Sequence, residues 1–388
     1  MSPASARKQL PAPDGAGAWL TIDVDRAALT ANMQAFRSLV GPQHRLMAVV
    51  KADAYGHGLL LAATAFLAGG ADMLGVHSLA EARALREGGV QAPVLVLGPL
   101  IADEVSVAVH LDAEITVASV AALSAAVASG AACRIHLKVE TGVNRQGIVE
   151  DELESCRRIL EAAPTCRLVG ISSHFADVED TTDHGYAEAQ MARFAAWREA
   201  VAALGYADLA AHMSCSAAVL VWDRTHGDLA RVGVAAYGIW PSRETRVAVH
   251  QRGRSELTLT PALTWRVRVS QVRQVAAGET VGYGRTWKAM TDSRIAVLPV
   301  GYADGLPRAL GGRGHVLLHG RRAPLVGRIC MNLCMVDVTN VPQTAAGDQA
   351  VLLGRQGDEI ITAEMLADQL GTIAYEVLTL PGPTWTRR

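Results

Sequence analysis

The sequence predicts an α/β protein in which a (β/α)8 TIM barrel is followed by a mostly antiparallel β-strand C-terminal domain. Two observations support this fold class. From Trp19 to about Ile239, short β-branched runs alternate with Ala/Leu-rich segments of helical period, as parallel strands joined by helices require. After about residue 250, polar and apolar residues alternate with period two between Gly, Pro and Asn turns, which is typical of antiparallel strands.

The first part of the chain contains one more candidate strand than the eight of a (β/α)8 barrel. The candidates are residues 20–24, 45–50, 73–78, 93–98, 113–118, 134–139, 167–173, 209–214 and 231–238. An open doubly wound sheet is the alternative, but the G-x-G-x-x-G turn that usually follows its first strand is missing. We therefore expect the last eight runs to form the barrel. Residues 20–24 would then lie outside it, with the C-terminal domain as their candidate partner.

The segments between the strands, such as AEARALREGG, contain good helix formers and end in glycine, a common signal at helix C-termini. The hydrophobic pattern changes from alternating strands and helices to period-two alternation within VAVHQRGRSE (247–256), which we take as the boundary between the domains. The expected organisation is a flexible leader over 1–18, the barrel over 19–252 and the β domain over 253–388.

Composition narrows the functional classes. Among 388 residues, 36 basic and 38 acidic side chains give a formal net charge of −2, which disfavours nucleic acid or an anionic membrane as a partner. No apolar run is long enough to span a bilayer, and no apolar stretch follows the basic N-terminal residues as in a secretory signal. The six cysteines show neither a disulfide framework nor zinc-ligand spacing. We expect a cytoplasmic protein with reduced thiols and no metal.

The segment RLMAVVKADAYGHG (45–58) is the most informative for chemistry. It places Lys51 at the carboxyl end of a hydrophobic strand, the edge at which barrel enzymes keep their active sites. Apolar surroundings lower the pKa of a lysine amine and make it a Schiff-base nucleophile. A rim lysine that extends into solvent is the alternative, and the strand alone favours it.

The whole string from Lys51 to Gly58 resembles the pyridoxal-phosphate lysine signature of bacterial alanine racemases almost letter for letter. Further blocks resemble the family in the same order along the chain. They are LKVETGVNRQG (137–147), SHFA (173–176), HMSCSAA (212–218), RVGVAAYGIWPS (231–242), VGYGRTW (281–287), LPVGYADGLPR (298–308), PLVGRICMNLCMVDVT (324–339) and TIAYEVL (372–378). The resemblance implies a barrel that carries pyridoxal 5'-phosphate (PLP), a C-terminal β domain, and interconversion of L- and D-alanine that supplies D-alanine for peptidoglycan.

Phosphate in barrel enzymes commonly binds at the loops after strands seven and eight. Here these loops offer the hydroxyl of Ser216 and the backbone N–H groups of Gly233 and Val234. Helix capping by Ser216 and close packing at Gly233 are the structural alternatives. The resemblance adds two phenolic hydrogen bonds to the same phosphate, from Tyr55 and Tyr375.

Arg231 opens the last expected strand, an unusual place for a guanidinium unless something inside the barrel pairs with it. By resemblance it donates a hydrogen bond to the pyridine nitrogen of the cofactor. A guanidinium does not give up its proton, so it cannot charge the ring and leaves a weaker electron sink than a carboxylate would. A structural salt bridge is the alternative role.

Racemisation needs a base on each face of the substrate α-carbon, and the resemblance assigns these roles to Lys51 and Tyr283. A tyrosine with its ordinary pKa, near 10, is a poor base at neutral pH. The resemblance implies that His174 and Arg231 tune it through a Tyr–His–Arg hydrogen-bond chain. In the family this tyrosine comes from the partner subunit, which implies a head-to-tail homodimer with shared active sites.

The resemblance gives further residues roles around the substrate. Arg145 would approach the cofactor phenolate oxygen and the substrate carboxylate, and Met331 would contact that carboxylate through its backbone. Lys138 aligns with a position that is often carbamylated, although an ion pair with Glu140 remains the alternative. Supporting positions, some of which would line the entrance and attract an anionic carboxylate, are His212, Tyr302, Arg308 and Arg328.

Three residues depart from the family pattern. Asn332 stands where many family members have aspartate, Cys215 takes the place before Ser216 that asparagine usually holds, and Glu140 stands where aspartate is common. Substrate breadth therefore stays open, and a serine or broad-specificity amino-acid racemase is the first alternative. A PLP-dependent decarboxylase would not be expected to present a Gly-Tyr-Gly base such as Tyr283. A cofactor carrier without turnover would usually consist of the barrel alone.

Overall fold

The computed structural model describes residues 18–179, 182–254, 256–382 and 385–388. The chain divides into two compact units, one formed by Asp25–Ala262 and the other by the described residues up to Val24 together with Leu263–Arg388. We call the first the barrel unit and the second the β unit. The expected leader over 1–18 lies outside the described residues except for Ala18. The boundary expected after residue 252 falls inside the barrel unit, since the chain runs on past helix α10 to Ala262.

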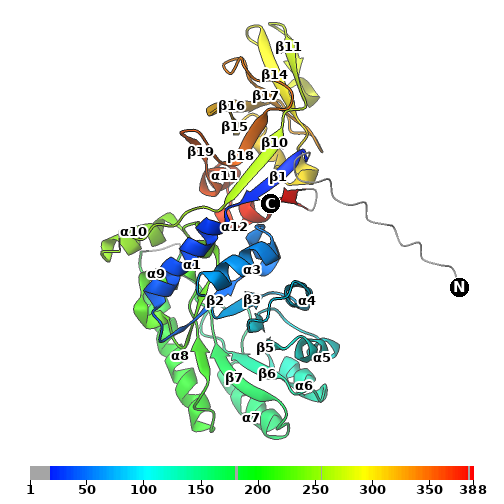
Figure 1. The fold of residues 1–388 in the computed structure, drawn as a ribbon. Helices are drawn as coiled ribbons and strands as arrows, with labels where there is room; N and C mark the ends of the chain where they lie inside the picture. Colours follow the sequence, from blue (N-terminus) through cyan, green and yellow to red (C-terminus); the bar gives the residue numbers. More distant parts are fainter. Residues whose placement is uncertain (1–17, 180–181, 255, 383–384) are drawn as a thin grey trace, which may run out of the picture. The chain divides into compact units, whose positions relative to one another are not determined.

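The barrel unit contains one parallel eight-stranded sheet in the order β8-β7-β6-β5-β4-β3-β2-β9 (Figure 1). Hydrogen bonds beyond the strand ladders bring β8 and β9 together, because Asp228 N–H donates to the Ala211 carbonyl at 3.0 Å and Arg231 N–H to the Ser214 hydroxyl at 3.0 Å. The sheet is therefore a nearly closed barrel, as predicted. Its strands are β2 (Arg45–Val49), β3 (Met73–Val76), β4 (Val94–Val96), β5 (Ala113–Val117), β6 (Arg134–Lys138), β7 (Arg167–Ser172), β8 (Ala210–His212) and β9 (Leu229–Val232).

Helices follow the strands and lie around the sheet (Figure 1). Side-chain caps define several of their starts: Asp25 accepts the Ala28 N–H at the start of α1, and Ser78 with Glu81 forms a capping box on α4. The helices are α1 (Arg26–Val40), α3 (Leu59–Ala68), α4 (Leu79–Glu87), α5 (Ala102–His110), α6 (Val120–Ala128), α7 (Leu153–Glu161), α8 (Gly185–Ala203), α9 (Ser216–Val221) and α10 (Arg243–Gln251). In the described part of the chain, no helix has both the length and the apolar character needed to cross a bilayer.

The last barrel strand differs from its prediction. The run 231–238 was expected to be extended, but β9 spans Leu229–Val232, and Val234–Tyr237 form a 3-10 turn, η3. Gly233 between them has φ −108° and ψ −112°, which ends the strand. The prediction was wrong because a short, fully buried apolar run has no periodicity that separates strand from turn. Arg231 is consequently the third residue of its strand rather than the first.

The β unit is built on a mostly antiparallel sheet in the order β11-β14-β17-β16-β15-β18-β10-β1-β20. The first strand of the chain, β1 (Leu20–Val24), pairs antiparallel with β10 (Leu263–Arg268). Residues 20–24 thus lie outside the barrel sheet. In β10, buried and half-buried residues alternate, which matches the period-two pattern of its sequence.

The remaining strands of the β unit are β11 (Gln271–Val275), β12 (Thr280–Val281), β13 (Trp287–Lys288), β14 (Ser293–Leu298), β15 (His315–Leu318), β16 (Arg321–Val326), β17 (Cys334–Asp337), β18 (Gln349–Gln356), β19 (Glu359–Ile361) and β20 (Thr386–Arg387). Two helices, α11 (Ala363–Leu370) and α12 (Ala374–Thr379), follow the sheet. Three 3-10 turns interrupt it: η4 (Tyr283–Arg285), η5 (Tyr302–Asp304) and η6 (Arg308–Leu310).

Candidate active site

Lys51 begins a short left-handed turn, α2 (Lys51–Tyr55), directly after β2. The four residues from Ala52 to Tyr55 all have positive φ, between 51° and 56°. Left-handed conformation costs a non-glycine residue roughly 1–2 kcal/mol, so the surroundings must hold this turn in place. Two side chains do so: Glu81 accepts the Ala52 N–H at 2.6 Å, and Asp53 accepts the Leu59 N–H at 2.8 Å. A strained and externally supported turn after a catalytic-type lysine marks this strand end as a functional site.

The turn directs Tyr55 back towards the loop after β9. The Tyr55 ring packs on Tyr237 with a centroid distance of 4.9 Å, and the buried His57 ring packs on the same tyrosine at 4.5 Å. A Cβ at Gly233 would lie 2.7 Å from the Tyr55 hydroxyl, so the two loops approach each other closely. Burial raises the pKa of Tyr55, which keeps its hydroxyl protonated and able to donate.

Ser216 joins this cluster from the loop after β8. Its hydroxyl accepts the N–H groups of Gly233 at 2.9 Å and Ala235 at 3.3 Å. Cys215, not Ser216, occupies the N-cap position of α9, so Ser216 does not cap that helix. A side chain at position 233 would fill the space between the Tyr55 and Ser216 hydroxyls. The hydroxyls of Tyr55 and Ser216 therefore border a small space of the kind that holds a phosphate, while the Gly233 N–H that was predicted to face it is donated to Ser216.

Arg231 is 8% exposed and has an unusually complete set of acceptors. Nη1 donates to the carbonyl and the Nδ1 atom of His212, and Nη2 donates to the carbonyls of Ser173 at 2.8 Å and Met213 at 3.1 Å. Nη2 also lies 3.3 Å from Nδ1 of His174, so its two hydrogens are shared among three acceptors. Among the described residues no carboxylate contacts Arg231 and no hydrogen bond uses its Nε–H. The salt-bridge alternative is therefore not supported, and one donor of the guanidinium stays available.

His174 follows β7 and is neutral in this environment. Burial lowers the pKa of His174 to about 3, and the positive charges of Arg231 and Arg145 add to the effect. Because the Arg231 guanidinium can only donate, Nδ1 of His174 is the acceptor in their contact. The ring proton then resides on Nε2, which can donate to a further group.

Lys51 and Lys138 lie at the same edge of the barrel as Arg145. Partial burial lowers the pKa of Lys51, the charge of Arg145 lowers it further, and Glu81 opposes the change. Burial, together with Arg145 and Arg231, lowers the pKa of Lys138 to about 8. Both amines are thus more readily neutral, and more nucleophilic, than ordinary lysines.

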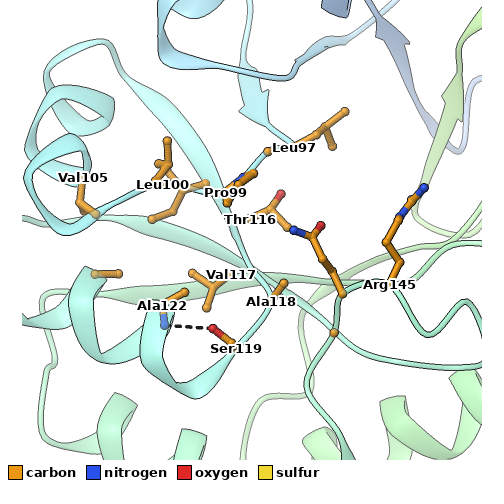
Figure 2. A pocket seen from close by; sticks show the side chains of 15 residues that line it. Leu97, Pro99, Leu100, Val105, Thr116, Val117, Ala118, Ser119, Ala122 and Arg145 are labelled. Carbon is orange, nitrogen blue, oxygen red and sulfur yellow. Dashed lines mark hydrogen bonds between the residues drawn. The ribbon is translucent and has the colours of Figure 1, made fainter.

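Lys138 and Glu140 do not form the ion pair considered as an alternative, since no salt bridge joins them in the described part of the chain. The Glu140 carboxylate instead accepts the Gly142 N–H at 2.5 Å within its own loop. Arg145 in this loop is exposed and borders a pocket of about 380 Å³ at the ends of β4 and β5 (Figure 2). Leu97 and Val117 form part of its apolar wall.

The β unit carries a second set of predicted residues on neighbouring loops. Tyr283, in η4, is 73% exposed, and Met331 is 57% exposed. A Cβ at Gly284 would lie 2.8 Å from the Arg328 guanidinium, so Arg328 covers the turn that presents Tyr283. The Tyr302 N–H donates to the Cys330 carbonyl at 3.1 Å, which joins η5 to the same loop.

Two further predicted residues lie on other elements of the β unit. Arg308 is exposed in η6, and Tyr375 is half-buried in α12. The structure therefore gathers the predicted site residues into two sets. The set in the barrel unit contains Lys51, Tyr55, Lys138, Arg145, His174, His212, Ser216, Arg231, Gly233 and Val234, and the set in the β unit contains Tyr283, Tyr302, Arg308, Arg328, Met331 and Tyr375.

The structure shows the surroundings of two residues that depart from the family pattern, Asn332 and Cys215. The Asn332 amide donates to the Asp304 carboxylate at 3.1 Å, a contact that an aspartate could not make without a proton. Burial raises the pKa of the Cys215 thiol to about 12, so Cys215 adds no charge beside Ser216.

Several supporting residues were missed from the sequence. Glu81 was recognisable as a helix cap from the Ser78-x-x-Glu81 spacing, but its contact with Ala52 was not. The buried His136 on β6 and the half-buried Glu114 on β5 form a hydrogen-bonded pair at 2.8 Å. A charged residue within the apolar run AEITVA was the one available signal for that pair.

These features define a (β/α)8-barrel protein with a lysine amine of lowered pKa at the carboxyl ends of its strands. Residues 24–241 match the family model described as alanine racemase, N-terminal domain, and residues 262–388 match alanine racemase, C-terminal domain. The chain belongs to the alanine racemase family, a family of isomerases.

Individual proteins agree with this assignment. The chain is 42% identical to an alanine racemase of Desulfosudis oleivorans over 93% of its own length and 94% of the relative's. The crystal structure of alanine racemase from Bacillus anthracis with bound L-Ala-P superposes with a TM-score of 0.89 at 33% identity, covering 96% of this chain and 94% of that one. The crystal structure of alanine racemase from E. faecalis superposes with a TM-score of 0.86 at 34% identity, covering 96% of this chain and 99% of that one.

Proposed function

We propose that this protein interconverts L-alanine and D-alanine with PLP as cofactor, in a homodimer whose two copies share their active sites. The observation that carries the proposal is the arrangement around Arg231. Its four Nη hydrogens all have neutral acceptors, and its Nε–H is the remaining donor at the barrel edge that also holds Lys51. Such a donor suits a ring nitrogen that must be hydrogen-bonded but not protonated.

The residues of the barrel unit fit the cofactor. The space at Gly233, between the hydroxyls of Tyr55 and Ser216, suits the phosphate, and Tyr375 is the proposed further phenolic donor. The Lys51 amine, with its lowered pKa, suits covalent attachment to an aldehyde. When bound, PLP supplies an electron-accepting ring that stabilises the charge left as the substrate loses its α proton.

The protein's own groups would then hold and move that proton. Lys51 is the proposed base on one face of the substrate, and Tyr283 from a second copy of the chain is the base on the other. His174 is neutral and carries its proton on Nε2, so it can stabilise the tyrosine oxygen while that oxygen is deprotonated. Arg231 fixes His174 through Nδ1 and so holds this donor in place.

Substrate contacts follow from the same two sets of residues. Arg145 is the proposed guanidinium for the substrate carboxylate, with the Met331 backbone as its partner from the β unit. Tyr302, Arg308 and Arg328 are exposed on the β unit and would favour entry of an anionic carboxylate. The pKa of Lys138, about 8, leaves a neutral amine available for carbamylation, which would give Arg145 a negative neighbour.

Chiral chromatography of L-alanine, L-serine, L-lysine and L-arginine incubated with the holoenzyme tests the substrate. We expect alanine to racemise fastest, and a preference for a larger side chain would replace the proposal with a broad-specificity racemase. Carbon dioxide release faster than racemisation would favour a decarboxylase instead. Rescue of a bacterium that requires D-alanine for its peptidoglycan would test the cellular role.

A further inference from the structure

Four charged or ionisable side chains form one continuous hydrogen-bonded chain through the barrel unit. Arg231 on β9 donates to Nδ1 of His212 on β8, and Nε2 of His212 lies 2.8 Å from Nδ1 of His136 on β6. Nε2 of His136 lies 2.8 Å from a carboxylate oxygen of Glu114 on β5. Both imidazoles are 1% exposed. In the described part of the chain no group of three or more His, Cys, Asp or Glu side chains is arranged to hold a metal ion.

The two ends of this chain fix the position of every proton within it. A guanidinium only donates, so Nδ1 of His212 accepts and its proton must be on Nε2. That proton is donated to Nδ1 of His136, whose own proton must then be on Nε2. The carboxylate of Glu114 only accepts, so it completes the sequence. All three bonds can exist together only when both rings are neutral Nε2–H tautomers.

The charges of the groups agree with this order. Burial lowers the pKa of His212 well below its ordinary value, which keeps the ring neutral. Burial raises the pKa of Glu114, but the hydrogen bond from His136 and the neighbouring positive charges, those of Arg134 and Arg45 among them, together outweigh burial and lower the pKa. Arg134 lies 3.4 Å from the second carboxylate oxygen, so the oxygen facing His136 is left to that ring.

Gly170 on β7 makes the chain possible. His136 and His212 stand on strands that flank β7, and Gly170 pairs with His136 in the parallel ladder. A Cβ at position 170 would overlap the His136 imidazole. Only a glycine here lets the two rings meet across the intervening strand, which indicates a built connection rather than an incidental contact.

We propose that Glu114 and His136 are positioning residues for Arg231: through His212 they fix the rotation of the guanidinium and supply its counter-charge, so that Nε–H stays directed at its ligand. A buried cation with only neutral direct partners needs such compensation. That the Nε–H faces a cofactor ring nitrogen rests on the proposed function. The assignment of the ring protons of His212 and His136 to Nε2 does not.

The test is 15N NMR of the full chain with PLP added and its histidines 15N-labelled, with His136→Gln and His212→Gln used to assign the signals. We expect both rings to be neutral Nε2–H tautomers. A proton on Nδ1 of either ring, or a doubly protonated ring, would overturn the proposed order. The NMR measurement needs no turnover, so it tests the tautomers independently of whether the protein racemises alanine.

Glu114→Leu removes the terminal acceptor, and Glu114→Gln keeps an oxygen acceptor without the charge. We expect Glu114→Leu to change the 15N signals of both rings and to lower kcat on the order of tenfold with an unchanged KM. Glu114→Gln should keep the tautomers, with a smaller loss of kcat.

Asp348→Asn is the matched control, since it alters a histidine–carboxylate pair, His319–Asp348, in the β unit. Unchanged ring signals and kcat in folded Glu114→Leu would refute the positioning role. Should that variant fail to fold, Glu114→Gln retaining wild-type kcat would refute the counter-charge.

Discussion

Arg231 in the barrel unit is 8% exposed and its donors are held by carbonyls and imidazoles, whereas Tyr283 in the β unit is 73% exposed and is presented on a short turn. Both are proposed to serve the same reaction. The difference indicates a division of tasks. The barrel unit holds its charged groups in fixed positions, as binding of the proposed cofactor would require, because burial strengthens electrostatic interactions. The β unit presents Tyr283, the proposed second base, on an exposed turn whose environment a second copy of the chain would complete.

Substitution of Lys51 is the most direct test of this division of tasks between the two units. We expect Lys51→Ala to lower racemisation by at least about 10⁴-fold, because the variant loses both the amine that attaches the cofactor and one of the two bases. Chiral chromatography measures the rate, and the visible absorption of the purified protein after borohydride reduction measures covalent attachment. Lys288→Ala, at an exposed lysine of the β unit, is the control and should keep both. Substantial activity in Lys51→Ala would refute the assignment of this amine.

Tyr283→Phe tests the proposed base on the exposed turn of the β unit. We expect a loss of roughly 10²–10⁴-fold, the usual contribution of a positioned acid–base group, with little change in stability because the side chain is exposed. Thermal unfolding would check the second point. Rates equal to wild type in both directions would show that another group is the second base.

Mixing subunits sharpens the same test. If Lys51 and Tyr283 of one site come from different chains, a dimer of one Lys51→Ala and one Tyr283→Phe subunit contains one intact site. Unfolding and refolding the two variants together should therefore restore activity that neither shows alone. If both bases came from the same chain, every site in the mixture would lack one base and no activity would return.

Gly233→Ala tests how closely the barrel unit is fitted to its ligand. The new Cβ would lie 2.7 Å from the Tyr55 hydroxyl, too close for both groups to keep their positions. We expect weaker PLP binding, on the order of tenfold, since a crowded methyl displaces one of the proposed phosphate donors. Cofactor titration followed by absorbance measures this. Tyr55→Phe in the same chain should relieve the overlap, and Gly382→Ala, which meets open space, should behave as wild type.

The extent to which the sequence predicted the structure also differs between the units. The barrel and the antiparallel sheet followed from hydrophobic periodicity, which records burial. The left-handed turn over Ala52–Tyr55 did not, because alanine and tyrosine carry no local preference for positive φ and tertiary contacts with Glu81 impose it. The link between Glu114 and Arg231 was equally invisible, since it joins four strands and depends on the absence of a side chain at Gly170.

The last prediction concerns the stability of the barrel unit in acid rather than its activity. His174 has a folded pKa of about 3 against an ordinary value of 6.5, so the unfolded chain binds the proton more readily. Its contribution to stability is complete above pH 6.5 and is lost as the pH falls towards 3, amounting to about 2 kcal/mol between pH 6.5 and pH 5. Urea unfolding at the two pH values measures this loss. His174→Gln should reduce the loss, whereas His110→Gln, at an exposed position on α5, should leave it unchanged. An equal loss in wild type and His174→Gln would mean that the ring is not held neutral, and the donor proposed for Tyr283 would lose its basis.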